Sequence, residues 1–225
     1  MALYTHIYYL PFYFQAVKGT SAEGSGIRTM PYLVSITIAS IAVGGFVTVV
    51  GLYVPFTWAG SALFTVGAGM IYTLKPHSPV GMWIGYQILA GTGAGMCVQI
   101  PFIAVQVVLS KKDIPVGNAI AVFFNSLGGA ISIGIAQNIF SNALVREIPR
   151  YTAGVDPAVI VGAGATQIRQ VTPPEQLSGV LKAYNGALVQ SYTLAIAYAG
   201  CAFLSSLLFE WKSVKGKKLE MGGGA

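Results

Sequence analysis

The feature that most restricts this sequence is a run of thirty residues, Val80 to Leu109, without an Asp, Glu, Lys, Arg or His. A helix of that length measures roughly 45 Å at about 1.5 Å per residue, which is enough to cross a lipid bilayer together with its headgroup regions. Soluble domains carry about 25% charged residues, whereas this chain of 225 residues carries 9%. The run therefore predicts a helix that lies in a membrane.

Other long stretches also lack Asp, Glu, Lys and Arg. They comprise residues 29–74, 114–145 and 183–209, and each is long enough for at least one membrane span. Residues 29–74 are too many for one helix, so a turn is expected at Gly51 to Pro55. The sequence therefore predicts an all-α fold, a polytopic membrane helix bundle.

Six spans are expected within a transmembrane bundle that covers residues 1–209. They comprise residues 2–17, 31–50, 56–74, 80–109, 114–144 and 187–209. The first is short for a span, and Pro11 is expected to kink it. Pro101 is expected to bend the fourth span for the same reason.

Three polar segments separate or follow these spans. Residues 18–30 are interpreted as a polar connector, and residues 145–186 as a loop that holds an amphipathic helix at the membrane surface. That helix is expected to begin with a capping box at Thr172 to Glu175, and Asp113 is expected to cap the fifth span. Residues 210–225 form a basic tail, whose last four residues are expected to be disordered.

The lysines predict how the chain lies in the membrane. Lys111 and Lys112 are separated from the tail lysines by an even number of expected spans, so both groups lie on one side. The positive-inside rule makes that side cytoplasmic and the loop at 145–186 extracellular. The expected location is the plasma membrane, with a cytoplasmic C-terminus. The net charge of +6 does not indicate nucleic-acid binding, because the lysines cluster at span ends.

Pairs of glycines at four-residue spacing are typical of helices that approach closely in lipid. Packing roles are expected for glycines of the fourth and fifth spans: Gly81, Gly85, Gly91, Gly95, Gly128 and Gly129. The Gly91-x-Gly93-x-Gly95 pattern resembles part of a nucleotide-binding fingerprint, but no strand precedes it and Met96 stands where the last glycine would be. Helix packing is therefore the favoured interpretation.

Carboxamide side chains are sparse in the expected spans and need partners where water is absent. Gln87, Gln99 and Gln106 lie in the fourth span, while Asn118, Asn125 and Ser132 recur every seven residues in the fifth. Two interpretations stay open. These groups either line a substrate path, or they make hydrogen bonds between helices worth about 0.6–2 kcal/mol each.

Aromatic residues dominate the first segment. Tyr4, Tyr8, Phe12 and Gln15 follow one another at helical spacing and therefore share one face. Such a face can stack a flat, lipophilic substrate, or it can form an aromatic belt at the membrane interface. The position of Tyr8 and Phe12 near the middle of the segment favours the pocket.

Several other functions are not expected. His6 and His77 lack Cys, Asp or Glu at ligand spacing, so neither a metal nor another cofactor is predicted. The spans hold no nucleophile–base–acid set, which argues against an enzyme. Cys97 and Cys201 both fall in apolar spans, where packing is favoured over a disulfide. No acidic residue lies inside an expected span, so His6 is the one candidate for proton binding at membrane depth.

Four groups of residues carry a resemblance that covers essentially the whole chain. They comprise YLPFYFQ at 9–15, GYQILAG at 85–91 with QIP at 99–101, FFNSLGGA at 123–130 and KAYN at 182–185. Together, and in this order, they resemble the C-terminal part of a major facilitator superfamily transporter. The likeness is greatest to the fungal toxin- and drug-efflux pumps of the fourteen-span drug:proton antiporter branch.

The resemblance implies that the six segments correspond to the last six spans of such a carrier. The first and fourth would line the central cavity, the second and fifth would pack at the interface between halves, and the third and sixth would face lipid. The expected substrate-binding residues are Tyr8, Phe12, Gln15, Gln87, Gln99, Gln106 and Asn125. The expected function is proton-coupled efflux of a small lipophilic metabolite or drug by alternating access.

Two departures from the family pattern bear on that expectation. The stretch from Gly45 to Gly51 keeps the glycines of a family turn motif but lacks its Asp-Arg pair. The earlier spans, with the coupling acids of the family, are absent, and the short first segment suggests that the chain starts inside a larger reading frame. The expected partners are a lipophilic substrate, the bilayer and a missing N-terminal half. The alternative function is a non-transporting remnant or membrane scaffold.

Overall fold

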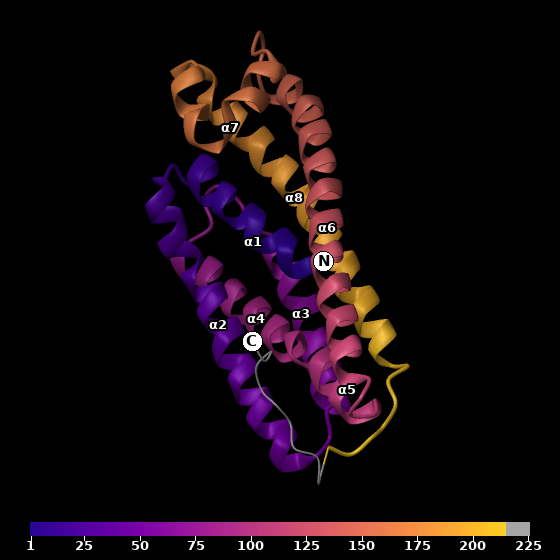
Figure 1. The fold of residues 1–225 in the computed structure, drawn as a ribbon. Helices are drawn as coiled ribbons and strands as arrows, with labels where there is room; N and C mark the ends of the chain where they lie inside the picture. The colour runs from indigo at the N-terminus through magenta and orange to yellow at the C-terminus, as the bar shows by residue number, and fades with distance from the viewer. Residues whose placement is uncertain (215–225) are drawn as a thin grey trace.

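The computed structural model describes residues 1–214, and most of them are helical (Figure 1). In chain order the elements are α1 (Ala2–Phe12), the π-helical turn η1 (Tyr13–Val17), α2 (Ala22–Val50), α3 (Val54–Tyr72), α4 (Val80–Val98), α5 (Ile100–Val108), α6 (Ile114–Tyr151), α7 (Pro157–Val171) and α8 (Pro174–Ser206). In this part of the chain the only β pairing is an isolated bridge between Leu52 and Ser213. The predicted all-α fold is confirmed.

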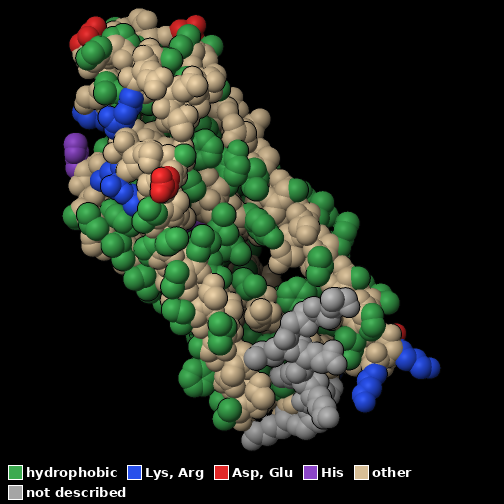
Figure 2. Space-filling view, turned by 60° about the vertical axis from the view of Figure 1, so that its left-hand side comes forward, with side chains coloured by type: hydrophobic (Ala, Val, Ile, Leu, Met, Phe, Trp, Pro, Cys, Tyr) green, Lys and Arg blue, Asp and Glu red, His purple; other side chains and the backbone are tan. Residues whose placement is uncertain are grey.

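Five helical stretches are long and apolar enough to cross a membrane: α2, α3, α4 with α5, α6 and α8. The chain is therefore a multi-pass membrane protein. The first segment is helical but short, since α1 and η1 together cover residues 2–17. Figure 2 shows charged side chains gathered toward the two ends of the molecule, with a hydrophobic zone between them. We call these ends the α7 end and the α5 end.

The spanning helices pack in a sequence that differs from their order in the chain. Helix α2 lies along α4, α4 along α3, α3 along α8, and α8 along α6. Helix α1 contacts α2, α6 and α8, and Figure 1 shows α1 and α4 between α2 and α6. The bundle is thus an arc whose ends are α2 and α6. These two helices are also the least buried of the spanning helices. In each of them 22% of the membrane-spanning window is buried, against 33–44% in the others.

Glycines on two faces of α4 hold the middle of this arc together. A Cβ added at Gly91 would lie 2.5 Å from the Tyr32 carbonyl oxygen on α2, and one at Gly95 would meet Ile36 on the same helix. A Cβ at Gly93 would instead lie 2.6 Å from the Phe64 Cα on α3. Residues two apart in a helix point to nearly opposite sides. Helix α4 is therefore wedged between α2 and α3 at backbone contact distance.

The other predicted packing glycines divide into two groups. Gly128 and Gly129 lie under the start of α1, where added Cβ atoms would be 3.3 Å from Met1 and 3.1 Å from Tyr4. Gly81 and Gly85 have no atom within 4 Å of an added Cβ. Within the described chain these two glycines are therefore not at a helix contact, contrary to the expectation from their spacing.

Two of the helix breaks predicted from the sequence are present in the structure. Gly51 ends α2 in the left-handed conformation, with φ at 82°, so the turn between the second and third spans requires glycine there. The fourth span is interrupted at Gln99, and Pro101 lies in the first turn of α5, where its missing N–H is tolerated. The prediction of a bend at Pro101 is confirmed.

Several predicted boundaries are wrong. Residues 22–30 are the beginning of α2 and not a connector, because Ser21 caps that helix by accepting a hydrogen bond from the Gly24 N–H at 3.0 Å. The expected surface helix and the sixth span are one continuous helix, α8, since no proline follows Pro174 to interrupt it. The fifth span continues past residue 144 to Tyr151, about 57 Å from its first residue.

The region between α6 and α8 holds a helix that the sequence analysis missed. Helix α7 begins at Pro157, and Asp156 caps it by accepting a hydrogen bond from the Ala158 N–H at 2.8 Å. The Asp-Pro pair is the signal that could have identified it. Neither expected cap is formed: Thr172 donates instead to the Ile168 carbonyl at 2.6 Å, and Asp113 accepts from the Ser110 hydroxyl at 2.7 Å.

Candidate substrate-binding face

Helix α1 is joined to α6 by hydrogen bonds between phenols and carboxamides. The Tyr4 hydroxyl donates to Asn125 Oδ1 at 2.6 Å, and the Tyr9 hydroxyl donates to Gln137 Oε1 at 2.9 Å. Asn125 is one of the predicted site residues, whereas Gln137 was not identified from the sequence. Asn125 is exposed, so the first of these bonds lies at the surface of the bundle.

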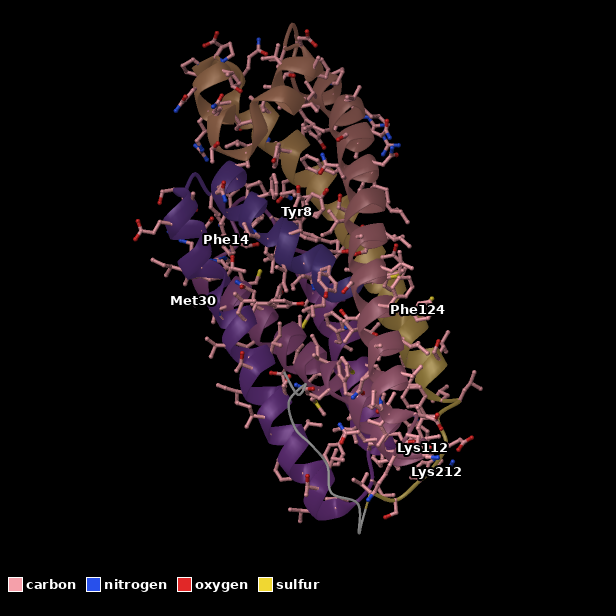
Figure 3. The ribbon with its side chains drawn as sticks, in the orientation of Figure 1. Tyr8, Phe14, Met30, Lys112, Phe124 and Lys212 are labelled. Atoms are coloured by element: carbon pink, nitrogen blue, oxygen red, sulfur yellow. The ribbon has the colours of Figure 1, made fainter. Side chains whose placement is uncertain are left out.

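An aromatic cluster connects the same helices with α8. Its members are Tyr8, Tyr9 and Phe12 on α1, Phe140 on α6, and Tyr184 on α8, with neighbouring ring centroids 5.0–5.6 Å apart. Tyr9 and Tyr184 are fully buried, whereas Tyr8 is 38% exposed and Phe12 is half-buried. Figure 3 shows Tyr8 on α1, between α2 and α6. The surface of the cluster is therefore formed by Tyr8 and Phe12.

Helix α4 presents one open face. Five of the exposed or half-buried residues of α4 and its C-cap recur at helical spacing and fall within about 60° of one another around the helix axis: Gly81, Gly85, Ile88, Thr92 and Gln99. Gln99 lies at the break between α4 and α5 and is exposed, and Gln106 on α5 is half-buried. The predicted residues Gln99 and Gln106 thus lie on accessible parts of the bundle.

The remaining two predicted glutamines bond to α2. The Gln87 side chain is fully buried, and its Nε2 donates to the Arg28 carbonyl at 3.0 Å. Gln15 Nε2 donates to the Ser25 hydroxyl at 2.9 Å. Gln15 lies in the π-helical turn, which shifts it away from the face that Tyr8 and Phe12 share. In this conformation both amides connect helices.

His6 occupies the centre of the bundle. Its Nδ1 lies 3.2 Å from the Tyr32 hydroxyl, and its ring meets the edges of Tyr32, Phe64 and Tyr192 at 5.8–5.9 Å between centroids. The side chain is fully buried, and among the described residues Nε2 has no hydrogen-bond partner. The sequence identified this histidine as a lone polar group but not its contact with Tyr32.

One acidic side chain is buried in the described part of the chain. Glu147 lies near the end of α6, is 9% exposed in its side chain, and pairs with Arg150 at 2.9 Å. Gln190 on α8 lies 3.5 Å from the same oxygen and accepts a hydrogen bond from Arg146 at 2.7 Å. This acid was not identified from the sequence, because the predicted span ended at residue 144.

Comparison with known proteins gives relatives over nearly the whole chain. No protein-family model matches it. The chain is 43% identical over 219 residues to the MFS-type efflux pump MFS1 of Arthroderma benhamiae, which covers 97% of this chain and 41% of that pump. It is 42% identical over 214 residues to the efflux pump roqT of Penicillium rubens, covering 95% of this chain and 40% of the relative.

A third relative is the efflux pump aunC of Aspergillus niger, 40% identical over 211 residues, which are 94% of this chain and 40% of that protein. The chain thus spans about two fifths of the length of the curated relatives that it matches. This coverage is consistent with the C-terminal half of such a pump. Over nearly its whole length the chain is therefore similar to fungal proteins that are named MFS-type efflux pumps or efflux pumps.

Proposed function

We propose that this chain forms one half of a carrier that exports a small lipophilic compound by proton-coupled alternating access. The observation that carries the proposal is the open arc, in which α1, α4 and α5 lie between the two least buried spanning helices, α2 and α6. The relatives, which are named efflux pumps, support the direction of transport. A second half, closing against α2 and α6, would turn the open side of the arc into a central cavity.

The residues proposed to contact the substrate fall into two sets. Tyr8 and Phe12 offer exposed ring surface, on which a flat apolar molecule can stack. Asn125, Gln99 and Gln106 offer carboxamides that can hydrogen-bond polar atoms of that molecule. Gln15 and Gln87 already bond to α2, so in this conformation their proposed part is to hold the cavity wall.

We propose that the α5 end is cytoplasmic. Figure 3 shows Lys112 and Lys212 at the same end of the molecule, and positive charge favours the cytoplasmic side of a membrane. Helix α7 then lies outside the cell, at the opposite end. The expected tail lysines Lys215, Lys217 and Lys218, like the last four residues, lie outside the described residues. The proposed location is the plasma membrane.

The proton-binding acid is proposed to be supplied by the other half, because the central part of the described bundle contains His6 but no Asp or Glu. The relatives are more than twice as long as the matched region, which leaves room for such a half. The second candidate is a non-transporting remnant or scaffold, which the partial coverage alone also fits.

The test is transport from vesicles. The chain is reconstituted alone, and also together with the separately expressed remaining part of the Arthroderma benhamiae pump, and efflux of a lipophilic fluorescent dye is followed under a proton gradient. We expect no flux from the chain alone and gradient-dependent flux from the pair. Flux from the chain alone as a monomer would contradict the half-carrier proposal. Failure of the two parts to co-purify would favour the remnant.

A further inference from the structure

The α7 end of the first segment is bound tightly to the turn between α3 and α4. Lys18 Nζ donates to the carbonyl oxygens of Pro76 at 2.8 Å and Ser78 at 2.7 Å. The Tyr13 hydroxyl donates to the carbonyl oxygen of Lys75, also at 2.8 Å. Desolvation by burial, and then the charge of Arg28, lower the pKa of the Lys18 ammonium. Three hydrogen bonds therefore connect the end of this segment to one turn.

Helix α7 holds the same end from another side. The Arg169 guanidinium donates to the Val17 carbonyl at 3.0 Å, at the C-terminal end of η1, where a positive charge is favoured. The guanidinium also lies over Gly19, where an added Cβ would be 2.7 Å from its central carbon. The φ of Gly19 is 69°, so the chain turns there in the left-handed region.

The helix is irregular between this fixed end and the aromatic face. Pro11 provides no backbone N–H, and the π-helical turn Tyr13–Val17 changes the hydrogen-bond register directly after Phe12. Kinks in helices occur at such prolines and π-helical turns. The orientation of α1, which carries Tyr8, therefore depends on the contacts that hold the end of the segment at Lys18.

We propose that Lys18 is a positioning residue, which together with Tyr13 and Arg169 forms a clamp that sets the orientation of α1 and of its Tyr8–Phe12 surface. Release of the clamp allows α1 to bend at Pro11 and the π-helical turn. The clamp itself rests on contacts within this chain. Only its effect on substrate rests on the proposed function.

Hydrogen–deuterium exchange of the chain in detergent micelles tests the clamp directly. The variants are Lys18→Met, which removes both donated bonds, Lys18→Arg, which retains donors, and Lys75→Met as matched control. Lys75 lies in the same turn with an exposed side chain, and no hydrogen bond or ion pair of its ammonium is present in the described chain. We expect exchange in residues 8–20 to be about tenfold faster in Lys18→Met, and unchanged in the other two. Arg169→Gln should give a smaller increase in the same segment.

Two results would overturn the proposal. One is equal exchange of residues 8–20 in Lys18→Met and Lys75→Met. The other is faster exchange of Lys18→Met in all segments alike, which would mean a general loss of stability.

A second readout uses the carrier assembled with the remaining part of the relative. Lys18→Met should raise the dye KM several-fold at equal expression, and Lys18→Arg should restore it. An unchanged KM despite faster exchange would refute the effect on substrate. If the assembled protein shows no transport at all, the proposed function fails, while the exchange data still decide whether the clamp exists.

Discussion

Substituting alanine for single glycines of α4 should change stability in opposite directions on its different faces. At Gly93 the added methyl group would lie 2.6 Å from the Phe64 Cα and 2.8 Å from the Gly60 carbonyl oxygen. Both are backbone atoms, so the two helices must move apart. Overpacking of this kind costs about 1–3 kcal/mol.

The matched control is Gly81→Ala on the same helix. No atom lies within 4 Å of an added Cβ there, so the methyl group meets nothing and the helix gains from the smaller conformational freedom of alanine. The gain is about 0.5–1 kcal/mol. The two substitutions, which are chemically identical, should therefore differ by roughly 1.5–4 kcal/mol, the sum of the two effects.

Unfolding in mixed micelles, followed by tryptophan fluorescence, measures this difference. Trp83 is a suitable reporter because it lies on α4 and is 6% exposed. Gly93→Ala should unfold at lower denaturant than the unmodified chain, and Gly81→Ala at the same or higher denaturant. Equal effects of the two substitutions would refute the assignment of α4 faces.

Further predictions follow from side-chain contacts. A double-mutant cycle of Tyr4→Phe and Asn125→Ala should give a coupling energy of about 0.5–1.5 kcal/mol, and additivity would exclude the bond between them. Tyr9→Ala should destabilise the chain by about 3–5 kcal/mol because the ring is fully buried. Tyr8→Ala should cost far less stability and should instead weaken dye binding in the assembled carrier. A larger loss of stability for Tyr8→Ala than for Tyr9→Ala in denaturant unfolding would contradict the assigned burial of the two rings. Glu147→Ala should cost about 0.5–1.5 kcal/mol in the same assay, less for Glu147→Gln, because it removes the buried acceptor that Arg150 and Gln190 share; no loss in either would show that this acceptor does not stabilise the contact between α6 and α8.

The fold was largely predictable because its main signal is the absence of charge. Runs without ionisable residues locate spanning helices without knowledge of their neighbours, and Gly51 and Pro101 mark breaks by local backbone chemistry. The start of α2 was not predictable in this way. Residues 22–30 are polar and glycine-rich, and they are helical because Ser21 caps them and because Ser25 and Thr29 are buried against other helices.

The candidate site was less predictable, because helical spacing shows which residues share a face and not which neighbour that face meets. Gly81 and Gly85 have the same spacing as Gly91 and Gly95, yet only the second pair contacts α2. Gln87 likewise bonds to a backbone carbonyl of α2, a partner that no spacing rule identifies. Such contacts depend on the packing of whole helices.

We propose that a second half binds at the open side of the arc, between α2 and α6. Figure 3 labels Met30 on α2 and Phe124 on α6, and both side chains are more than half exposed. Photo-cross-linking tests this proposal in the chain co-expressed with the remaining part of the relative. Each variant carries one photo-cross-linking amino acid at an exposed position of α2 or α6. Val66 on α3 and Leu204 on α8, at 57% and 63% exposure, are the controls. We predict cross-links to the other half from α2 and α6, and none from Val66 or Leu204. Cross-links from the two control positions alone would contradict the proposed binding of the second half between α2 and α6.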